Sequence, residues 1–417
     1  MLKLHVAIFV HFVILNAVYD CVVQSNPTNL AIKLDAKKLP TLNLTFSLLG
    51  LKPRQSDIDL CFMRTDELIG YYGFIAEEYD VETEDGYILK MFRCYSTKFA
   101  EEDRSPILLI PGMYDTSDTF CLSPPDESLA YFLAERKYDV FLYNPRGNKY
   151  SHGHRDNKRF DSSKKYGLYW AFSWFEMGYY DLPAVIEEIL RITKREKVSA
   201  IGHSEGGTSL FVLLSTRPEF NSIVKLAVSM ASFTFMTNIG FPLDVILLAV
   251  QLFKNFRDFE FAPNTLPQKI LSLLICTIMN GAICDHGINF VLGPSYNERS
   301  NTAVSVCHYP AAGSFNQILH YSQGYVHKTF GPMMKIGQTT TRNFDLGKIT
   351  APNAFLYSSN DPHTDKNDVG LLRKSLAHNN RTHFKDYPDK NHIDFIWSKT
   401  AYATVYPKII ELDALYT

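Results

Sequence analysis

The stretch Gly202-His203-Ser204-Glu205-Gly206 decides the fold, because this G-x-S-x-G sequence lies between two segments of different periodicity. The apolar run 198–201 before it predicts a short buried strand, and the run 207–214 after it predicts a helix. A tight turn between a strand and a helix needs glycine at its flanks, since larger side chains would collide with both elements. Such a turn exposes the hydroxyl of its central serine, so Ser204 is the candidate nucleophile.

Strands and helices alternate along the chain on both sides of this turn. The segments 79–83 and 87–92 flank an Asp-Gly pair, which predicts a hairpin, and the helix predicted over 176–195 has one apolar face. Buried strands that alternate with helices predict an α/β fold with a mostly parallel sheet and helices on both faces. Four further apolar runs of strand length support this prediction: 106–110, 138–143, 225–230 and 352–357.

The alternation stops between about residues 233 and 348, where the stretches 241–253 and 270–278 are strongly apolar and helical. We expect a mainly helical cap or lid inserted above the carboxyl ends of the strands, which divides the hydrolase-like core into 61–232 and 349–417. Most apolar residues of the cap would pack onto the core. One exposed apolar face would be enough to bind a lipid–water interface transiently.

The N-terminus has the pattern of a cleaved signal peptide over residues 1–18, with a basic start, an apolar run and small residues near the cut. About ten apolar residues are too few for the ~20 of a membrane span, although a buried N-terminal helix is an alternative. We expect a secreted or lysosomal/luminal protein without a transmembrane span, and an N-terminal extension over 19–60. Asn43 and Asn380 begin candidate glycosylation sequons.

Composition limits the classes of function that need to be considered. A net charge of −2 without a long basic run argues against nucleic acid as a partner. Seven cysteines fit one or two disulfides, whereas the lack of C-x-x-C and H-E-x-x-H patterns argues against a zinc site. We therefore expect no zinc site, and interpret His152 and His154 as loop residues.

A serine hydroxyl needs a histidine to remove its proton and a carboxylate to orient that histidine. In α/β-hydrolases these groups follow the serine in the order acid, then histidine. Asp361 follows the predicted strand 352–357, and His392 lies in the last loop between a strand and a helix, so we assign them as acid and base. Two other acids and three other histidines remain alternatives: Asp365, Asp368, His363, His378 and His383.

The tetrahedral intermediate of acyl transfer needs two backbone N–H donors. Glu205, directly after the nucleophile, should supply one, and Met113, after Pro111-Gly112, should supply the other. A carboxylate on Glu205 would disfavour a nearby negative charge. Its side chain therefore either points away or pairs with a cation.

The chain resembles the acid lipase family, the gastric and lysosomal acid lipases and their invertebrate relatives, from about Tyr72 to the C-terminus. The resemblance implies hydrolysis of neutral lipid esters, such as triacylglycerols or cholesteryl esters, without a cofactor. It also implies a lid and a cap disulfide between Cys276 and Cys284, for which free buried thiols are the alternative. Pro111 and Glu205 depart from the family pattern. The similar stretches are 78–89, 144–148, 170–173, 176–177, 180–184, 310–314 with His320, and 391–397.

These observations favour a serine ester hydrolase whose acyl-enzyme forms at Ser204. Two alternatives stay open. One is a weakly active or inactive lipid-binding or storage protein on the same fold, because fold does not imply function. The other is a carboxylesterase for small esters that does not act at lipid interfaces.

Overall fold

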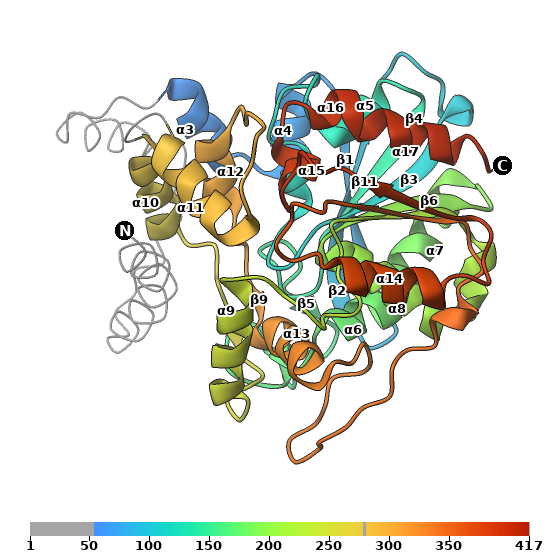
Figure 1. The fold of residues 1–417 in the computed structure, drawn as a ribbon. Helices are drawn as coiled ribbons and strands as arrows, with labels where there is room; N and C mark the ends of the chain where they lie inside the picture. The colour runs from blue at the N-terminus through green and yellow to red at the C-terminus, as the bar shows by residue number, and fades with distance from the viewer. Residues whose placement is uncertain (1–53, 278–280, 417) are drawn as a thin grey trace.

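The computed structural model describes residues 54–277 and 281–416 (Figure 1). The predicted signal peptide, the extension up to residue 53 and the Asn43 sequon lie outside these residues. Asn380 lies in an exposed turn before the last strand.

Nine strands of the described chain form one central sheet, in the order β1-β2-β4-β3-β6-β7-β10-β11, with β5 paired to β2. The strands from β4 to β11 are parallel, whereas β1, β4 and β5 pair with β2 in antiparallel fashion. The predicted α/β class with a mostly parallel sheet is confirmed. The strands are β1 (Ile75–Glu82), β2 (Tyr87–Tyr95), β3 (Ser105–Ile110), β4 (Tyr138–Tyr143), β5 (Gly153–His154), β6 (Val198–His203), β7 (Val224–Met230), β10 (Asn353–Tyr357) and β11 (Thr382–Asp386).

Burial explains why the central strands are continuous apolar runs. Every residue of β4 and β6 is buried, because helices cover both faces of the sheet. The predicted hairpin is β1 and β2, in which Glu82 pairs with Ile88. Gly86 in its turn has φ +95°, a conformation that favours glycine.

Two apolar layers hold helices against the sheet. Helices α7 (Leu182–Thr193), α8 (Glu205–Thr216) and α14 (Lys366–Ser375) pack on one face. Helices α5 (Leu129–Ala134) and α17 (Tyr406–Asp413) pack on the other (Figure 1). Because each helix buries its apolar face against the sheet, the alternation of strands and helices in the sequence gives a three-layer core.

The helix predicted over 176–195 is interrupted at its start. It consists of α6 (Trp174–Glu176), a π-helical turn over Met177–Asp181, and then α7. Pro183 has no N–H to donate, so it removes one α-helical hydrogen bond at this junction. The apolar periodicity of the segment did not reveal the break.

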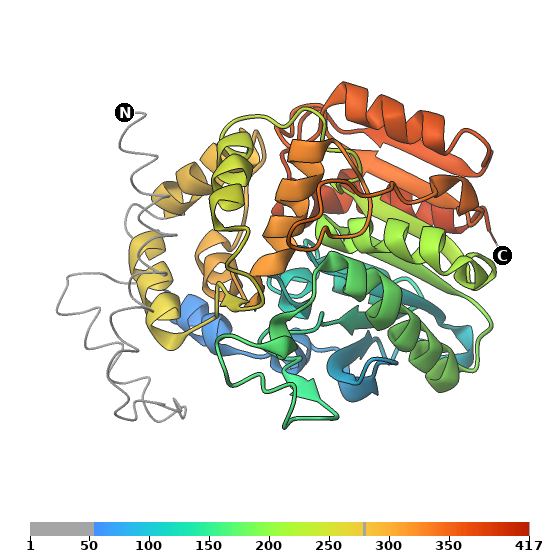
Figure 2. The same cartoon turned by 90° about the horizontal axis from the view of Figure 1, so that it is seen from below.

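The segment 233–348 contains α9 (Leu243–Val250), α10 (Leu266–Thr277), α11 (Ala282–Leu292), α12 (Thr302–His308) and α13 (Phe315–His327). A two-stranded sheet of β8 (Glu260–Phe261) and β9 (Gly313–Ser314) accompanies them. These elements lie together beyond one end of the central sheet, as Figures 1 and 2 show. No single described helix is long and apolar enough to cross a membrane, although α10 and α11, bent by 106°, pass that test together.

Two disulfides stabilise this region. Cys276 and Cys284 join α10 to α11, which is the pairing that the family resemblance implied. Cys61 and Cys307 join α3 (Gln55–Phe62) to α12, a pairing that the sequence did not suggest. The end of the predicted extension is therefore a helix that is covalently bonded to the segment above the core.

Candidate active site

The turn between β6 and α8 has the tight geometry that its sequence predicted. Ser204 has φ +52° and ψ −118°, a strained conformation for a residue with a side chain. A Cβ at Gly206 would lie 2.3 Å from the Ile110 carbonyl oxygen, and a Cβ at Gly202 would lie 2.3 Å from the Gly206 carbonyl carbon. Only glycine fits at these two positions. The tight turn between β6 and α8 therefore explains both the glycines of the sequence pattern and the strained backbone of Ser204.

Ser204, His392 and Asp361 form a hydrogen-bonded chain. His392 Nε2 lies 2.9 Å from Ser204 Oγ, and His392 Nδ1 lies 2.8 Å from Asp361 Oδ2. Burial opposes the ionisation of Asp361, but electrostatic interaction with His392 and His363 and the hydrogen bonds that both residues donate lower the pKa of this carboxyl below its usual value. An ionised Asp361 accepts the Nδ1 proton, which leaves the Nε2 lone pair facing the serine hydroxyl.

The alternative acids have other partners. Asp365 accepts a hydrogen bond of 2.7 Å from the backbone N–H of Asn367 and caps α14. Asp368 accepts one of 2.9 Å from the backbone N–H of Thr237. Asp361 is therefore the carboxylate that is bonded to His392.

The alternative histidines have other hydrogen-bond partners. His378 Nε2 lies 2.9 Å from the Ile349 carbonyl oxygen, and His383 Nε2 lies 2.7 Å from the Tyr416 hydroxyl. His363 is close to the site, but its backbone N–H donates to Asp361 Oδ1 over 2.9 Å. Its ring therefore flanks the acid, while the serine is bonded to His392.

The carboxyl-terminal end of α11 holds both loops that carry the acid and the base. His363 Nε2 donates to the Val291 carbonyl oxygen over 2.9 Å, and the His392 backbone N–H donates to the Leu292 carbonyl oxygen over 3.3 Å. The Asn391 side chain donates to the Gly293 carbonyl oxygen over 2.7 Å. The last carbonyls of a helix have no partner inside the helix, so they are available for these loops.

His203 and Phe233 both contact His392. The His203 Nε2–H donates to the His392 carbonyl oxygen over 3.0 Å, and burial lowers the pKa of His203 to about 3, so this ring is neutral. The Phe233 ring stacks on the His392 ring at 5.3 Å with an interplanar angle of 6°. Sequence reasoning assigned neither residue, although His203 lies next to the nucleophile.

The loop after β3 lies against the nucleophile. A Cβ at Gly112 would be 3.3 Å from Ser204 Cβ, so the backbone approaches the serine closely here. Met113 follows in this loop and is half-buried. Glu205 is the first residue of α8, so its N–H has no acceptor within the helix. The two backbone N–H groups predicted as donors thus belong to segments that flank Ser204.

Among the described residues, no cation pairs with the side chain of Glu205. It is buried, and its Oε1 accepts a hydrogen bond of 2.6 Å from Gln317 Nε2. Burial raises the pKa of Glu205 to about 8, which keeps the carboxyl neutral at acidic and neutral pH.

Among the described residues, Asp361, His363 and His392 bring ligand atoms within 4.8 Å of one another, a donor set that also suits a cation. In the structure the hydrogen bond between Asp361 and His392 uses two of these atoms. The arrangement is therefore set up for proton transfer between a serine, a histidine and a carboxylate.

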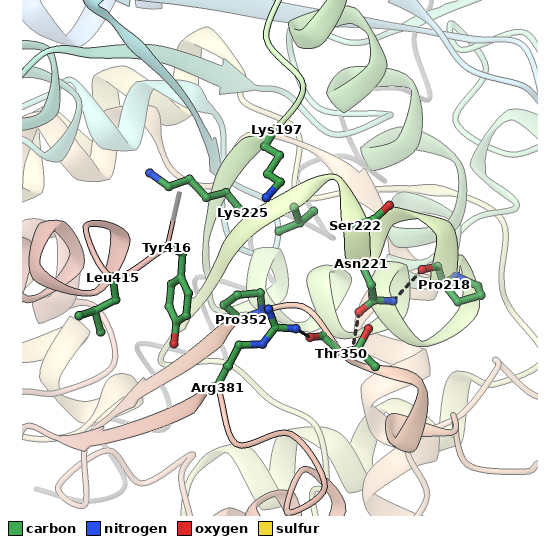
Figure 3. Close-up of a pocket in the computed structure, with 11 residues that line it drawn as sticks. Lys197, Pro218, Asn221, Ser222, Lys225, Thr350, Pro352, Arg381, Leu415 and Tyr416 are labelled. Atoms are coloured by element: carbon green, nitrogen blue, oxygen red, sulfur yellow. Dashed lines mark hydrogen bonds between the residues drawn. The ribbon is translucent and has the colours of Figure 1, made fainter.

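A cavity of about 650 Å³ lies away from this site (Figure 3). Lys225, Pro352 and Arg381 line it near the starts of three parallel strands, whereas Ser204 and Asp361 follow the strand ends. Lys225 is paired with Asp413 at 2.9 Å. Ligands of open α/β sheets bind at the carboxyl ends of the strands, so the candidate active site is the one at Ser204.

Comparison with protein families gives two matches. Residues 105–399 match the family described as alpha/beta hydrolase fold. Residues 65–124 match the partial alpha/beta-hydrolase lipase region. Together the two matches cover residues 65–399.

Three curated relatives are similar over most of their length. Lipase 1 of Drosophila melanogaster is 31% identical, over 84% of this chain and 79% of that protein. The human lysosomal acid lipase/cholesteryl ester hydrolase is 32% identical, over 85% of this chain and 91% of that protein. The rat gastric triacylglycerol lipase is 31% identical, over 84% of this chain and 92% of that protein.

Among solved structures, a soluble variant of the monoglyceride lipase of Saccharomyces cerevisiae has the same fold. The TM-score is 0.52 at 16% identity, over 81% of this chain and 95% of that chain. At this identity the likeness concerns the fold alone.

Proposed function

The chain belongs to the α/β-hydrolase lipases that include the gastric and lysosomal acid lipases, and we propose that it cleaves carboxylic ester bonds of neutral lipids through an acyl-enzyme at Ser204. Triacylglycerols and cholesteryl esters are the substrate classes named for its relatives. The observation that carries the proposal is the chain of hydrogen bonds from Asp361 through His392 to Ser204.

In this mechanism, Ser204 Oγ attacks the ester carbonyl carbon while His392 Nε2 takes the hydroxyl proton. The charge that develops on the carbonyl oxygen is stabilised by the backbone N–H groups of Met113 and Glu205. His392 then returns the proton to the leaving alcohol, and the acyl group stays on Ser204. A water molecule, deprotonated by His392, releases the fatty acid and restores the serine. Asp361 holds the imidazole in position and stabilises its charged form.

The segment 233–348 acts as a cap with an apolar outer surface that contacts the lipid–water interface. Ser204 is only 7% exposed, so a long acyl chain reaches it only when cap side chains move. The exposed apolar side chains that support interfacial contact follow one another on and after α9: Val245, Leu248, Leu252, Phe253 and Phe256.

Secretion or delivery to lysosomes fits the relatives, the two disulfides and the predicted signal peptide. Both destinations expose the protein to conditions under which structural disulfides persist.

A fluorophosphonate probe tests the proposal, because it reacts only with an activated serine. We expect the wild-type protein to be labelled and Ser204→Ala to be unlabelled. Ser215→Ala, which removes another buried serine of α8, should keep its labelling. Labelling of Ser204→Ala at the wild-type rate would refute the assignment, and an unlabelled wild type would favour the lipid-binding alternative.

The carboxylesterase alternative is separated by substrate. A lipase should hydrolyse emulsified long-chain esters faster than soluble short-chain esters at equal ester concentration. The opposite order would favour a small-ester carboxylesterase.

A further inference from the structure

Glu205 combines burial with an incomplete set of hydrogen-bond partners. The residue is only 2% exposed, and it forms no salt bridge with any of the described residues. Gln317 donates to Oε1, whereas Oε2 is buried without a hydrogen-bond partner. An ionised carboxylate in this position would lack compensation for the hydration that it loses.

The orientation of Gln317 is fixed by its second contact. The backbone N–H of Ser314 donates to Gln317 Oε1 over 2.8 Å, as part of the capping box of α13. The amide nitrogen therefore faces Glu205 and donates to it. This link joins α8, which carries the nucleophile at its start, to α13 of the cap.

Four phenols from four different segments interact electrostatically with Glu205. No cation among the described residues lowers the pKa of this carboxyl. Burial raises the pKa of each phenol, so all four are uncharged over the working range of the protein. The start of α8 favours an anion, but this partial charge is weaker than the effect of burial. The phenols are Tyr114 after β3, Tyr143 of β4, Tyr309 after α12 and Tyr321 of α13.

We propose that Glu205 is a positioning residue that functions only as the neutral acid, with its proton on Oε2, and that loss of this proton disables the active site. This inference rests on the proposed ester hydrolysis. The backbone N–H of Glu205 is one of the two proposed donors to the oxyanion, so a carboxylate on the same residue would repel the charge that develops there. The same charge, uncompensated in the interior, would also disturb the contact of α8 with α13.

The sign of the pH dependence follows from the raised pKa. Below about pH 8 Glu205 is protonated and the site is competent. Above it, the neutral fraction falls tenfold with each pH unit, and the rate of serine modification should fall with it.

The test compares the pH dependence of fluorophosphonate labelling in wild-type protein and in Glu205→Gln, which replaces the acid by a neutral group of the same shape. We expect the ratio of the rate at pH 9 to that at pH 6 to be about tenfold higher in Glu205→Gln, as follows from a pKa of about 8. Glu176→Gln is the matched control, since burial also raises the pKa of this carboxyl, which caps α6. Its rate ratio should equal that of the wild type.

Infrared difference spectra provide a readout that does not depend on activity. Raising the pH from 6 to 10 should reduce the carboxylic acid band of wild-type protein, and the loss should be smaller in Glu205→Gln. The loss that remains in this variant comes from other buried carboxyls such as Asp115, whose pKa burial raises to about 7. An equal alkaline decline in both proteins, or a Glu205 that is already ionised at pH 6, would overturn the proposal. A wild type that is unlabelled at every pH would instead contradict the proposed hydrolysis itself.

Discussion

One atomic contact distinguishes Asp361 from Asp365 and Asp368, the two acids that the sequence left as alternatives: Asp361 is hydrogen-bonded to His392. We expect Asp361→Asn to lower kcat by about 10⁴, because an amide no longer holds His392 in the tautomer that accepts the serine proton. Asp365→Asn should keep kcat within a few-fold of the wild type, since Asp365 only caps α14. Steady-state hydrolysis of a soluble ester measures both effects, and a larger loss in Asp365→Asn would contradict the assignment.

Gly206 allows a test of the strained turn. In Gly206→Ala the new Cβ would lie 2.3 Å from a backbone oxygen of β3, which cannot move aside without displacing the sheet. We expect the free energy of unfolding to fall by at least about 2 kcal/mol and labelling of Ser204 to be lost.

The control for this substitution is Gly287→Ala in α11, where a Cβ would have no atom within 4 Å. Alanine should leave the protein equally stable or stabilise it by up to about 1 kcal/mol, because it favours the helix. Urea unfolding measures both variants. Equal destabilisation of the two proteins would show that the turn does not require glycine at position 206.

At the residue scale, the sequence predicted the groups whose roles have local signals. The glycines around Ser204 mark the turn, and the loops after two strands mark Asp361 and His392. The partner of Glu205 had no such signal, because Gln317 lies 112 residues away on a helix of the cap.

At the scale of single elements, two disulfides link helices. They enclose loops of very different length. The Cys61–Cys307 bond closes a loop with a sequence separation of 246, against 8 for Cys276–Cys284. Chain entropy then predicts stabilisations of about 5.5 and about 2.5 kcal/mol, respectively.

We therefore expect the double substitution Cys61→Ser and Cys307→Ser to lower the melting temperature more than Cys276→Ser and Cys284→Ser. Calorimetry measures the difference. The second pair should affect the kcat more strongly relative to its stability loss, because α11 donates its terminal carbonyls to the loops of His363 and His392. A larger stability loss in the second pair would contradict the entropic argument.

Strands and helices with clear periodicity were predicted close to their observed ends. The hairpin β1–β2, the strands β3, β4, β7 and β10, and helix α8 lie where their patterns placed them. The break before α7 escaped prediction, because a π-helical turn keeps the apolar face of the segment continuous.

At the scale of the whole molecule, several exposed apolar side chains follow one another on and after α9 of the cap. We expect Leu252→Ser combined with Phe256→Ser to lower the hydrolysis of emulsified triacylglycerol about tenfold, since loss of apolar contact of this size is worth about 1.4 kcal/mol. These side chains are 80% and 67% exposed, so the fold should not depend on them.

Leu415→Ser is the matched control. Leu415 is 59% exposed and follows α17, which lies on the core and not in the cap (Figure 1). Its substitution should change neither emulsion nor soluble-ester hydrolysis. If the cap variant lost soluble-ester activity to the same extent as emulsion activity, interfacial binding would not be its defect.

The sequence by itself determined the α/β class, the turn at Ser204 and the chain order of the three hydrogen-bonded residues Ser204, Asp361 and His392. These features arise from short-range rules, namely apolar periodicity, turn chemistry and the position of loops at strand ends. Tertiary structure alone decided which carboxylate is bonded to His392, how Cys61 is paired and what surrounds Glu205. Each of these is a contact between distant segments, and such contacts depend on how layers and cap pack in three dimensions, which no local pattern encodes.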